Sequence, residues 1–216
     1  MVRRQALAKK WLTTLILTDR NMIPATGKNK TEKILLGIDP GTNVMGYGVI
    51  KAIGNKAEMV AMGVIDLRKI SDPYLRLGKI SERVQGIIDS YLPDDMAIEA
   101  PFFGKNVQSM LKLGRAQGVA IAAAIRHSVP IHEYAPLKTK MAITGNGSAS
   151  KEQVAGMLMR LLHLKEDEMP KFMDATDALG AAYCHFMQMG KPVADTHYRG
   201  WKDFVARNQS RVKNDE

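Results

Sequence analysis

The chain has 216 residues, 45% of them apolar, which is enough for one domain with a substantial hydrophobic core. No stretch approaches the ~20 uninterrupted apolar residues that a transmembrane helix needs, so we expect no membrane partner. The single cysteine, Cys184, excludes an intramolecular disulfide and is typical of a reducing compartment, so we expect a cytoplasmic protein. No Cys/His spacing matches a zinc motif, which argues against zinc.

The formal net charge of +9 is concentrated near the two ends of the sequence. Residues 1–33 hold eight basic and two acidic side chains, and residues 190–216 hold six and four, which leaves +1 for residues 34–189. We therefore expect a basic, disordered N-terminal extension (1–33), a folded domain (34–189) and a C-terminal tail (190–216). The extension also suits a transit peptide, a basic surface helix, or a start upstream of an alternative initiator at Met22.

Within the domain, charge is segregated along the chain. Residues 105–151 contain one acidic side chain, Glu133, and seven basic ones. The basic residues are Lys105, Lys112, Arg115, Arg126, Lys138, Lys140 and Lys151. This local surplus of positive charge can attract the phosphates of a nucleic acid whatever its base sequence. The net charge of the whole domain, only +1, does not reveal it.

The first element of the domain is an apolar run, residues 34–38, that ends in Asp39 and Pro40-Gly41. A short apolar run with an abrupt stop predicts a buried strand, and Pro-Gly forces a turn after it. Asp39 then lies at the rim of a sheet, where a carboxylate needs a cation or hydrogen-bond donors. A divalent metal is one interpretation, and an ordinary strand-end Asp that caps the turn is the other.

The following elements predict an α/β fold. Residues 44–50 and 57–65 read as strands, separated by the turn signal Gly54-Asn55, and residues 74–91 show helical periodicity after Asp72-Pro73. We expect further strands at 96–100 and 129–134, and helices at 106–127, 136–143, 150–162 and 174–187, the third opened by a Ser150/Gln153 capping box. This order predicts a mixed five-stranded sheet, three strands antiparallel and two parallel, with helices on both faces.

Four carboxylates lie at the ends of these predicted elements. Asp39 and Glu99 end two strands that we expect to be parallel neighbours, while Asp174 and Asp177 lie three residues apart on one face at the start of the last helix. Favourable interaction with the helix dipole is the structural alternative for that pair. Converging carboxylates repel unless cations intervene, and oxygen-only ligands suit Mg²⁺ or Mn²⁺. Two such ions would form a clamp for displacement at phosphorus.

The predicted helix 106–127 is rich in Gly and Ala, which allows close approach of a second helix. Self-association and close packing on its own sheet both fit this pattern.

The sequence resembles the RuvC family of Holliday-junction resolvases over residues 34–188. The resemblance rests on several segments in the family's order: Gly-Ile-Asp-Pro-Gly-Thr, Gly-Tyr-Gly-Val-Ile, Ala-Ile-Glu, Lys-Asn, Leu-Lys-Leu-Gly-Arg-Ala-Gln-Gly-Val-Ala, Glu-Tyr-Ala-Pro, Gly-Asn-Gly-Ser-Ala-Ser-Lys and Asp-Ala-Thr-Asp-Ala-Leu-Gly. It implies an RNase H-like nuclease domain and Mg²⁺-dependent paired nicking of four-way DNA junctions, with Mn²⁺ as a substitute. It also implies a homodimer through helix 106–127 and a branch-migration motor as partner.

The resemblance also assigns residues. The family's metal-binding, catalytic acids match Asp39, Glu99, Asp174 and Asp177. Its base-stacking aromatic matches Phe102, for which core packing is the alternative, and its basic positions match Lys140 and Lys151. With Lys105 of the basic run, these form the predicted DNA-binding set. The resemblance assigns no role to residues 1–33 or to the tail after 190.

Three other functions remain open from the residues alone. A phosphotransferase of the actin and sugar-kinase type also uses Asp-x-Gly-Thr, but such chains are longer and carry the motif twice. A non-catalytic junction-binding protein would not need four acids. An RNase H-like nuclease could instead act on another substrate, such as an RNA–DNA hybrid.

Overall fold

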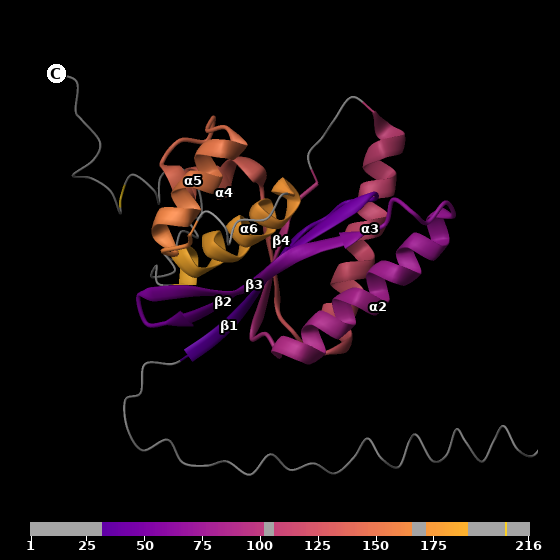
Figure 1. Cartoon of the computed structure of the whole chain (residues 1–216), viewed down its shortest axis with the longest axis horizontal. Coiled ribbons are helices and arrows are strands. Elements are labelled where there is room, and N and C mark those ends of the chain that lie inside the picture. The colour runs from indigo at the N-terminus through magenta and orange to yellow at the C-terminus, as the bar shows by residue number, and fades with distance from the viewer. Residues whose placement is uncertain (1–31, 102–105, 166–171, 190–205, 207–216) are drawn as a thin grey trace, which may run out of the picture. The chain divides into compact units, whose positions relative to one another are not determined.

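The computed structural model describes residues 32–101, 106–165, 172–189 and the single residue 206 (Figure 1). The predictions for the extension (up to residue 31), for the tail after residue 189 (residue 206 apart), and for Phe102 and Lys105 lie outside these residues. No helix among the described residues combines the length and apolar character needed to cross a membrane.

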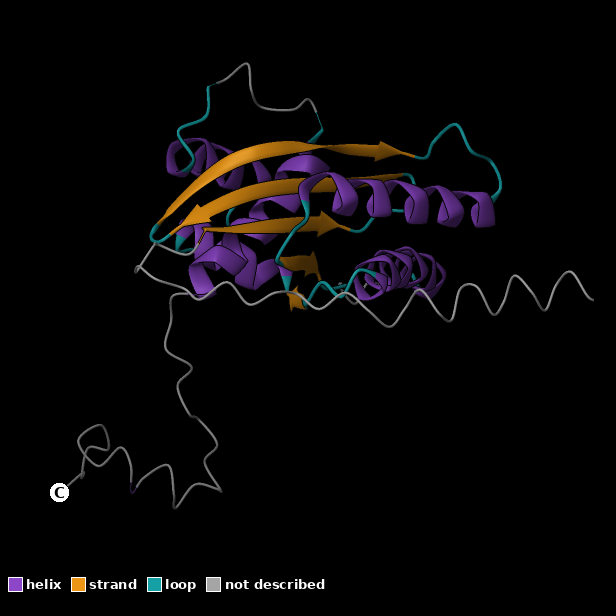
Figure 2. Cartoon of the chain, turned by 90° about the horizontal axis from the view of Figure 1, so that it is seen from below, coloured by secondary structure: helices purple, strands orange, loops and turns teal. Residues whose placement is uncertain are grey.

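The core of the domain is a mixed five-stranded sheet with the order β3-β2-β1-β4-β5. The pairs β1–β2 and β2–β3 are antiparallel, and the pairs β1–β4 and β4–β5 are parallel. The strands are β1 (Glu32–Asp39), β2 (Val44–Ile53), β3 (Lys56–Asp66), β4 (Asp95–Glu99) and β5 (Ile131–Tyr134). Figure 2 shows the three long strands beside the two short ones. The predicted sheet is confirmed.

Five described helices cover the sheet. They are α2 (Pro73–Tyr91), α3 (Val107–Arg126), α4 (Pro136–Thr144), α5 (Lys151–Leu161) and α6 (Met173–Met189). Helices α2 and α3 pack on one face of the sheet, and α5 and α6 share a core on the other (Figure 1). Helices on both faces were predicted, and this is confirmed.

Local capping explains where three of these helices begin. The Asp72 carboxylate accepts hydrogen bonds from the amides of Tyr74 and Leu75 at the start of α2. Asn106 caps α3 through the Ser109 amide. The predicted capping box of α5 is present, since the Ser150 and Gln153 side chains each bond the other residue's backbone. These caps satisfy amides that have no partner inside the helix.

The alternation of side chains along β1 decides which face Asp39 occupies. Leu36 and Ile38 are fully buried in the core under α2 and α3. Successive residues of a strand point to opposite faces, so Leu35, Gly37 and Asp39 point towards α6. The same rule places Ala97 and Glu99 of β4 on the α6 face. The two strand-end carboxylates therefore lie on one side of the sheet.

Candidate active site

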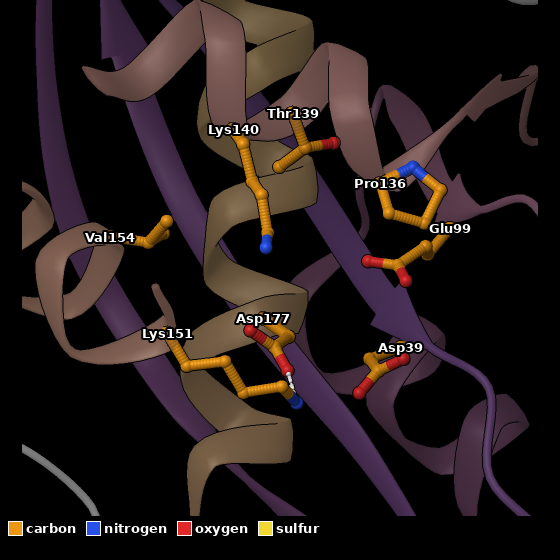
Figure 3. A pocket seen from close by; sticks show the side chains of 8 residues that line it. All are labelled: Asp39, Glu99, Pro136, Thr139, Lys140, Lys151, Val154 and Asp177. Carbon is orange, nitrogen blue, oxygen red and sulfur yellow. Dashed lines mark hydrogen bonds and ion pairs between the residues drawn. The ribbon is translucent and has the colours of Figure 1, made fainter. Parts of the chain in front are cut away.

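Asp39 and Glu99 end two neighbouring parallel strands. Ile38 pairs with Ile98 in the β1–β4 ladder, so the next residues, Asp39 and Glu99, emerge side by side at the same edge. Both line a pocket of about 200 Å³ (Figure 3). The full lining is Asp39, Glu99, Pro136, Thr139, Lys140, Lys151, Val154 and Asp177. Asp39, Glu99 and Asp177 thus meet at this edge, although their elements lie far apart in the sequence.

The third acidic contribution comes from α6, which lies directly on the sheet. A Cβ atom at Gly37 would lie 1.9 Å from the carbonyl oxygen of Ala178, so only glycine permits this approach. The first turn of α6 consequently lies over the ends of β1 and β4. Asp177 lines the pocket, whereas Asp174 does not, although Asp174 is near enough to raise the pKa of Asp39 electrostatically.

Two of the carboxyl groups that line the pocket are harder to ionise than ordinary carboxyl groups. Burial, followed by the charges of the other acids, with Glu99 first, raises the pKa of Asp39 to about 8. Burial and then the charge of Asp177 raise the pKa of Glu99 to about 7. Desolvation and like charges both disfavour ionised carboxylates. Such perturbed acids are typical of functional sites.

Two lysines supply the positive charge that the pocket has. Lys151 donates a hydrogen bond to Asp177 (Figure 3). Burial lowers the pKa of Lys151, but this bond and the charges of the nearby acids together raise it. Lys151 and Lys140 both lower the pKa of Glu99. Lys151 is also the first residue of α5, whose N-terminal amides favour anions. The predicted basic pair therefore lies beside the acids.

The side chains fit a hard divalent cation. Asp39, Glu99 and Asp177 offer only carboxylate oxygens, the ligands that Mg²⁺ and Mn²⁺ prefer. Lys151 is already paired with Asp177, so Asp39 and Glu99 keep strongly raised pKa values. A bound cation would reverse these shifts by favouring the ionised forms.

Part of the pocket wall and a second cluster of side chains carry no signal in the sequence. Pro136 and Thr139 of α4 line the pocket, and no pattern in the sequence indicates this. The structure also gathers Asp95, His132 and His185 elsewhere, with ligand atoms within 4.8 Å of one another. Their elements are distant in sequence, so Cys/His spacing could not reveal them.

The sheet order, with carboxylates from β1, β4 and α6 at one edge, defines the RNase H-like class of folds. The profile of the family described as crossover junction endodeoxyribonuclease RuvC matches residues 35–185. The chain belongs to this RuvC family.

Relatives and a solved structure agree with this assignment. The Bacteroides fragilis crossover junction endodeoxyribonuclease RuvC is 69% identical over 182 residues, which cover 84% of this chain and 97% of that protein. The Porphyromonas gingivalis protein of the same name is 58% identical over 185 residues, with 84% and 98% covered. Thermus thermophilus RuvC in complex with a Holliday junction substrate matches with a TM-score of 0.67 at 33% identity, covering 73% of this chain and 94% of that one.

Proposed function

We propose that this protein is a Holliday-junction resolvase, an endodeoxyribonuclease that nicks four-way DNA junctions in recombination and repair. The observation that carries the proposal is the convergence of Asp39, Glu99 and Asp177 on one pocket at the edge of an RNase H-like sheet. The Thermus relative, solved with a Holliday junction substrate, supports the choice of substrate.

The catalytic acids of the proposal are Asp39, Glu99, Asp174 and Asp177, which would hold two Mg²⁺ ions, with Mn²⁺ as the alternative. When bound, the two ions supply a clamp that polarises the phosphate and stabilises the attacking and leaving oxygens. The role of the acids is to present ionised oxygens, so Asp39 and Glu99 must lose the protons that burial favours. The role of Lys140 and Lys151 is to attract and orient the phosphate.

The homodimer of the proposal forms through α3. Part of the Ala-rich face, including Ala116, Ala120 and Ala124, is buried in this chain's own core, which accounts for some of the small residues. A second stripe of apolar and small residues is exposed, and its spacing is that of a coiled-coil seam. It consists of Val107 (64% exposed), Leu111 (53%), Gly114, Gly118 and Ile125 (64%). This exposed stripe supports the proposal that α3 of a second copy packs against it.

Residues outside the described ranges complete the proposal. Phe102 would stack on a base near the crossover, and Lys105 would contact the DNA backbone. The proposed nuclease domain runs to residue 189 and includes Glu32 and Lys33, because both belong to β1 and not to the extension as the sequence predicted. The basic extension then covers residues 1–31, and the tail covers residues 190–216. We also propose a cytoplasmic location and a branch-migration motor as partner.

The test compares cleavage of a mobile four-way junction, a flap and an RNA–DNA hybrid in Mg²⁺. Junction cleavage should dominate and should give two symmetric nicks. The Asp39→Asn variant should bind the junction in Ca²⁺ without cutting it in Mg²⁺. Preferential hybrid cleavage would favour another RNase H-like activity. Binding without nicking by the wild-type protein would favour a non-catalytic role, and tight ATP binding a phosphotransferase.

A further inference from the structure

A second group of ligand-type side chains lies on the α6 face of the sheet, away from the catalytic pocket. Asp95 is the first residue of β4 and Glu99 the last, so ~13 Å of strand separates them. His132 lies on β5 and His185 near the end of α6. The three side chains bring potential ligand atoms within 4.8 Å of one another.

The spacing of these atoms is close to that of a metal site. His132 Nε2 lies 3.4 Å from Asp95 Oδ1, and His185 Nε2 lies 3.7 Å from Asp95 Oδ2. Ligands that share a tetrahedral Zn²⁺ at ordinary bond lengths lie ~3.3 Å apart. A contraction of a few tenths of an ångström would therefore suffice for these two pairs.

His185 provides the independent reason to expect a ligand. Its ring is buried, and its Nε2 has no hydrogen-bond partner, whereas its Nδ1 lies 2.8 Å from the Tyr134 hydroxyl. If Nε2 carries the proton, a buried donor is unsatisfied; if it does not, its lone pair faces the Asp95 carboxylate. A cation between His185 Nε2 and the Asp95 carboxylate would remove the unfavourable contact in either case. His185 Nδ1–H would then donate its hydrogen bond to the Tyr134 hydroxyl, which would orient the ring towards the cation.

The protonation states suit metal binding. Burial, and then the nearby His132, lower the pKa of His185 to about 4, so the ring is a neutral imidazole at neutral pH. Burial raises the pKa of Asp95, but the hydrogen bond and charge of Lys33, together with His185 and His132, lower it overall. Neutral imidazole and ionised carboxylate are the forms that bind metals.

We propose that Asp95, His132 and His185 form a zinc site that is separate from the catalytic pocket and independent of the proposed function. Two imidazoles and one carboxylate favour Zn²⁺ over Mg²⁺, and a water molecule would take the fourth position.

Zinc binding requires two local changes. The His132 and His185 rings are stacked, with centroids 4.1 Å apart and planes 26° apart. In this arrangement the nitrogen lone pairs of the two rings do not converge on one ion. The His132 side chain is 41% exposed, so its ring would have to turn away from the stacked position on its solvent side. Lys33, whose Nζ lies 2.9 Å from Asp95 Oδ2, must withdraw. Lys33 therefore competes with the metal, and its removal should tighten zinc binding.

Zinc at this site would fix α6 against β4 and β5. His185 follows Asp177 by eight residues of the same helix, or ~12 Å. The site would thus stabilise the helix that presents a catalytic carboxylate, at the end opposite to that carboxylate.

The test is a Zn²⁺ titration of the EDTA-treated full chain against a chromophoric chelator, in excess Mg²⁺ to occupy the carboxylate pocket. One ion should bind per chain, at least tenfold more weakly in His132→Gln and several-fold more tightly in Lys33→Met. Co²⁺ in its place should give the intense visible absorption of a tetrahedral site.

The matched control is His127→Gln, because His127 also faces a single carboxylate, Asp89, at 3.0 Å. This variant should bind zinc as the wild type does. His132 is half-exposed, so its replacement should leave the fold intact, which circular dichroism checks. Equal zinc affinity in His132→Gln and His127→Gln, or no zinc binding by both wild type and Lys33→Met, would overturn the proposal.

Discussion

Gly46 lies directly against the backbone of Asp174. A Cβ atom at Gly46 would lie 1.9 Å from the Asp174 carbonyl oxygen, and Gly46 is also the residue that pairs with Asp39 in the β1–β2 ladder. Gly46 of β2 thus lets the start of α6, which carries Asp174 and Asp177, lie against the sheet next to Asp39.

Gly46→Ala should therefore disable cleavage by displacing the start of α6. Misplacement of catalytic groups by an ångström costs roughly 100-fold in rate, and we expect a loss of that order. The measurement is single-turnover junction cleavage at saturating Mg²⁺, with junction binding followed in parallel.

Gly78→Ala on α2 is the control for this substitution. A Cβ atom there meets nothing within 4 Å, and alanine is the better helix former by about 1 kcal/mol. This variant should cleave normally and unfold at an equal or higher temperature. If Gly46→Ala cleaved as well as Gly78→Ala, the close approach would not matter for catalysis.

Asp39→Asn should stabilise the metal-free protein at high pH. Unfolded Asp39 ionises near its ordinary pKa of 3.8, whereas the folded group keeps its proton up to about pH 8. The folded state binds more protons over this interval, so stability falls as the pH rises from about 4 to 8, and asparagine removes this loss. In EDTA near pH 8, Asp39→Asn should melt at a higher temperature than the wild type, by about 2–4 °C for each kcal/mol gained in the free energy of unfolding. Near pH 4 the two proteins should melt at the same temperature.

The same carboxylates should make the Mg²⁺ requirement depend on pH. Asp39 and Glu99 must be ionised to bind a metal, and their pKa values of about 8 and about 7 mean that protons compete at neutral pH. The Mg²⁺ concentration for half-maximal cleavage should fall as the pH rises through this range. A half-saturating concentration that does not change between about pH 6 and 9 would contradict the pKa shifts.

Much of this site was predictable because its signals are local. Asp39 before Pro40-Gly41 marks a strand end, and the Ser150 capping box marks where Lys151 begins a helix. The pocket wall at Thr139 and the His132–His185 cluster were not predictable. They depend on the register of β5 beside β4 and on how far α6 extends across the sheet, which no single segment encodes.

Lys151→Gln should shift cleavage towards higher pH and lower its rate at neutral pH. Lys151 lowers the pKa of both Asp39 and Glu99, so its removal makes both acids harder to ionise. Loss of one charged group that stabilises a phosphate should cost roughly 10²–10³-fold. A pH–rate profile of junction cleavage measures both effects. Lys79→Gln, which removes an exposed lysine that pairs with Glu82, should leave the profile unchanged.

Leu111→Glu should dissociate the proposed homodimer without unfolding the chain. Leu111 is 53% exposed in the N-terminal half of the α3 stripe, so the change adds no buried charge to the protomer but places two glutamates at the seam of a dimer. Sedimentation velocity should show a monomer, and junction products should change from paired to single nicks. Val60→Glu, at an exposed position of β3, controls for a charge added to an apolar surface. A Leu111→Glu protein that stays dimeric would place the interface elsewhere.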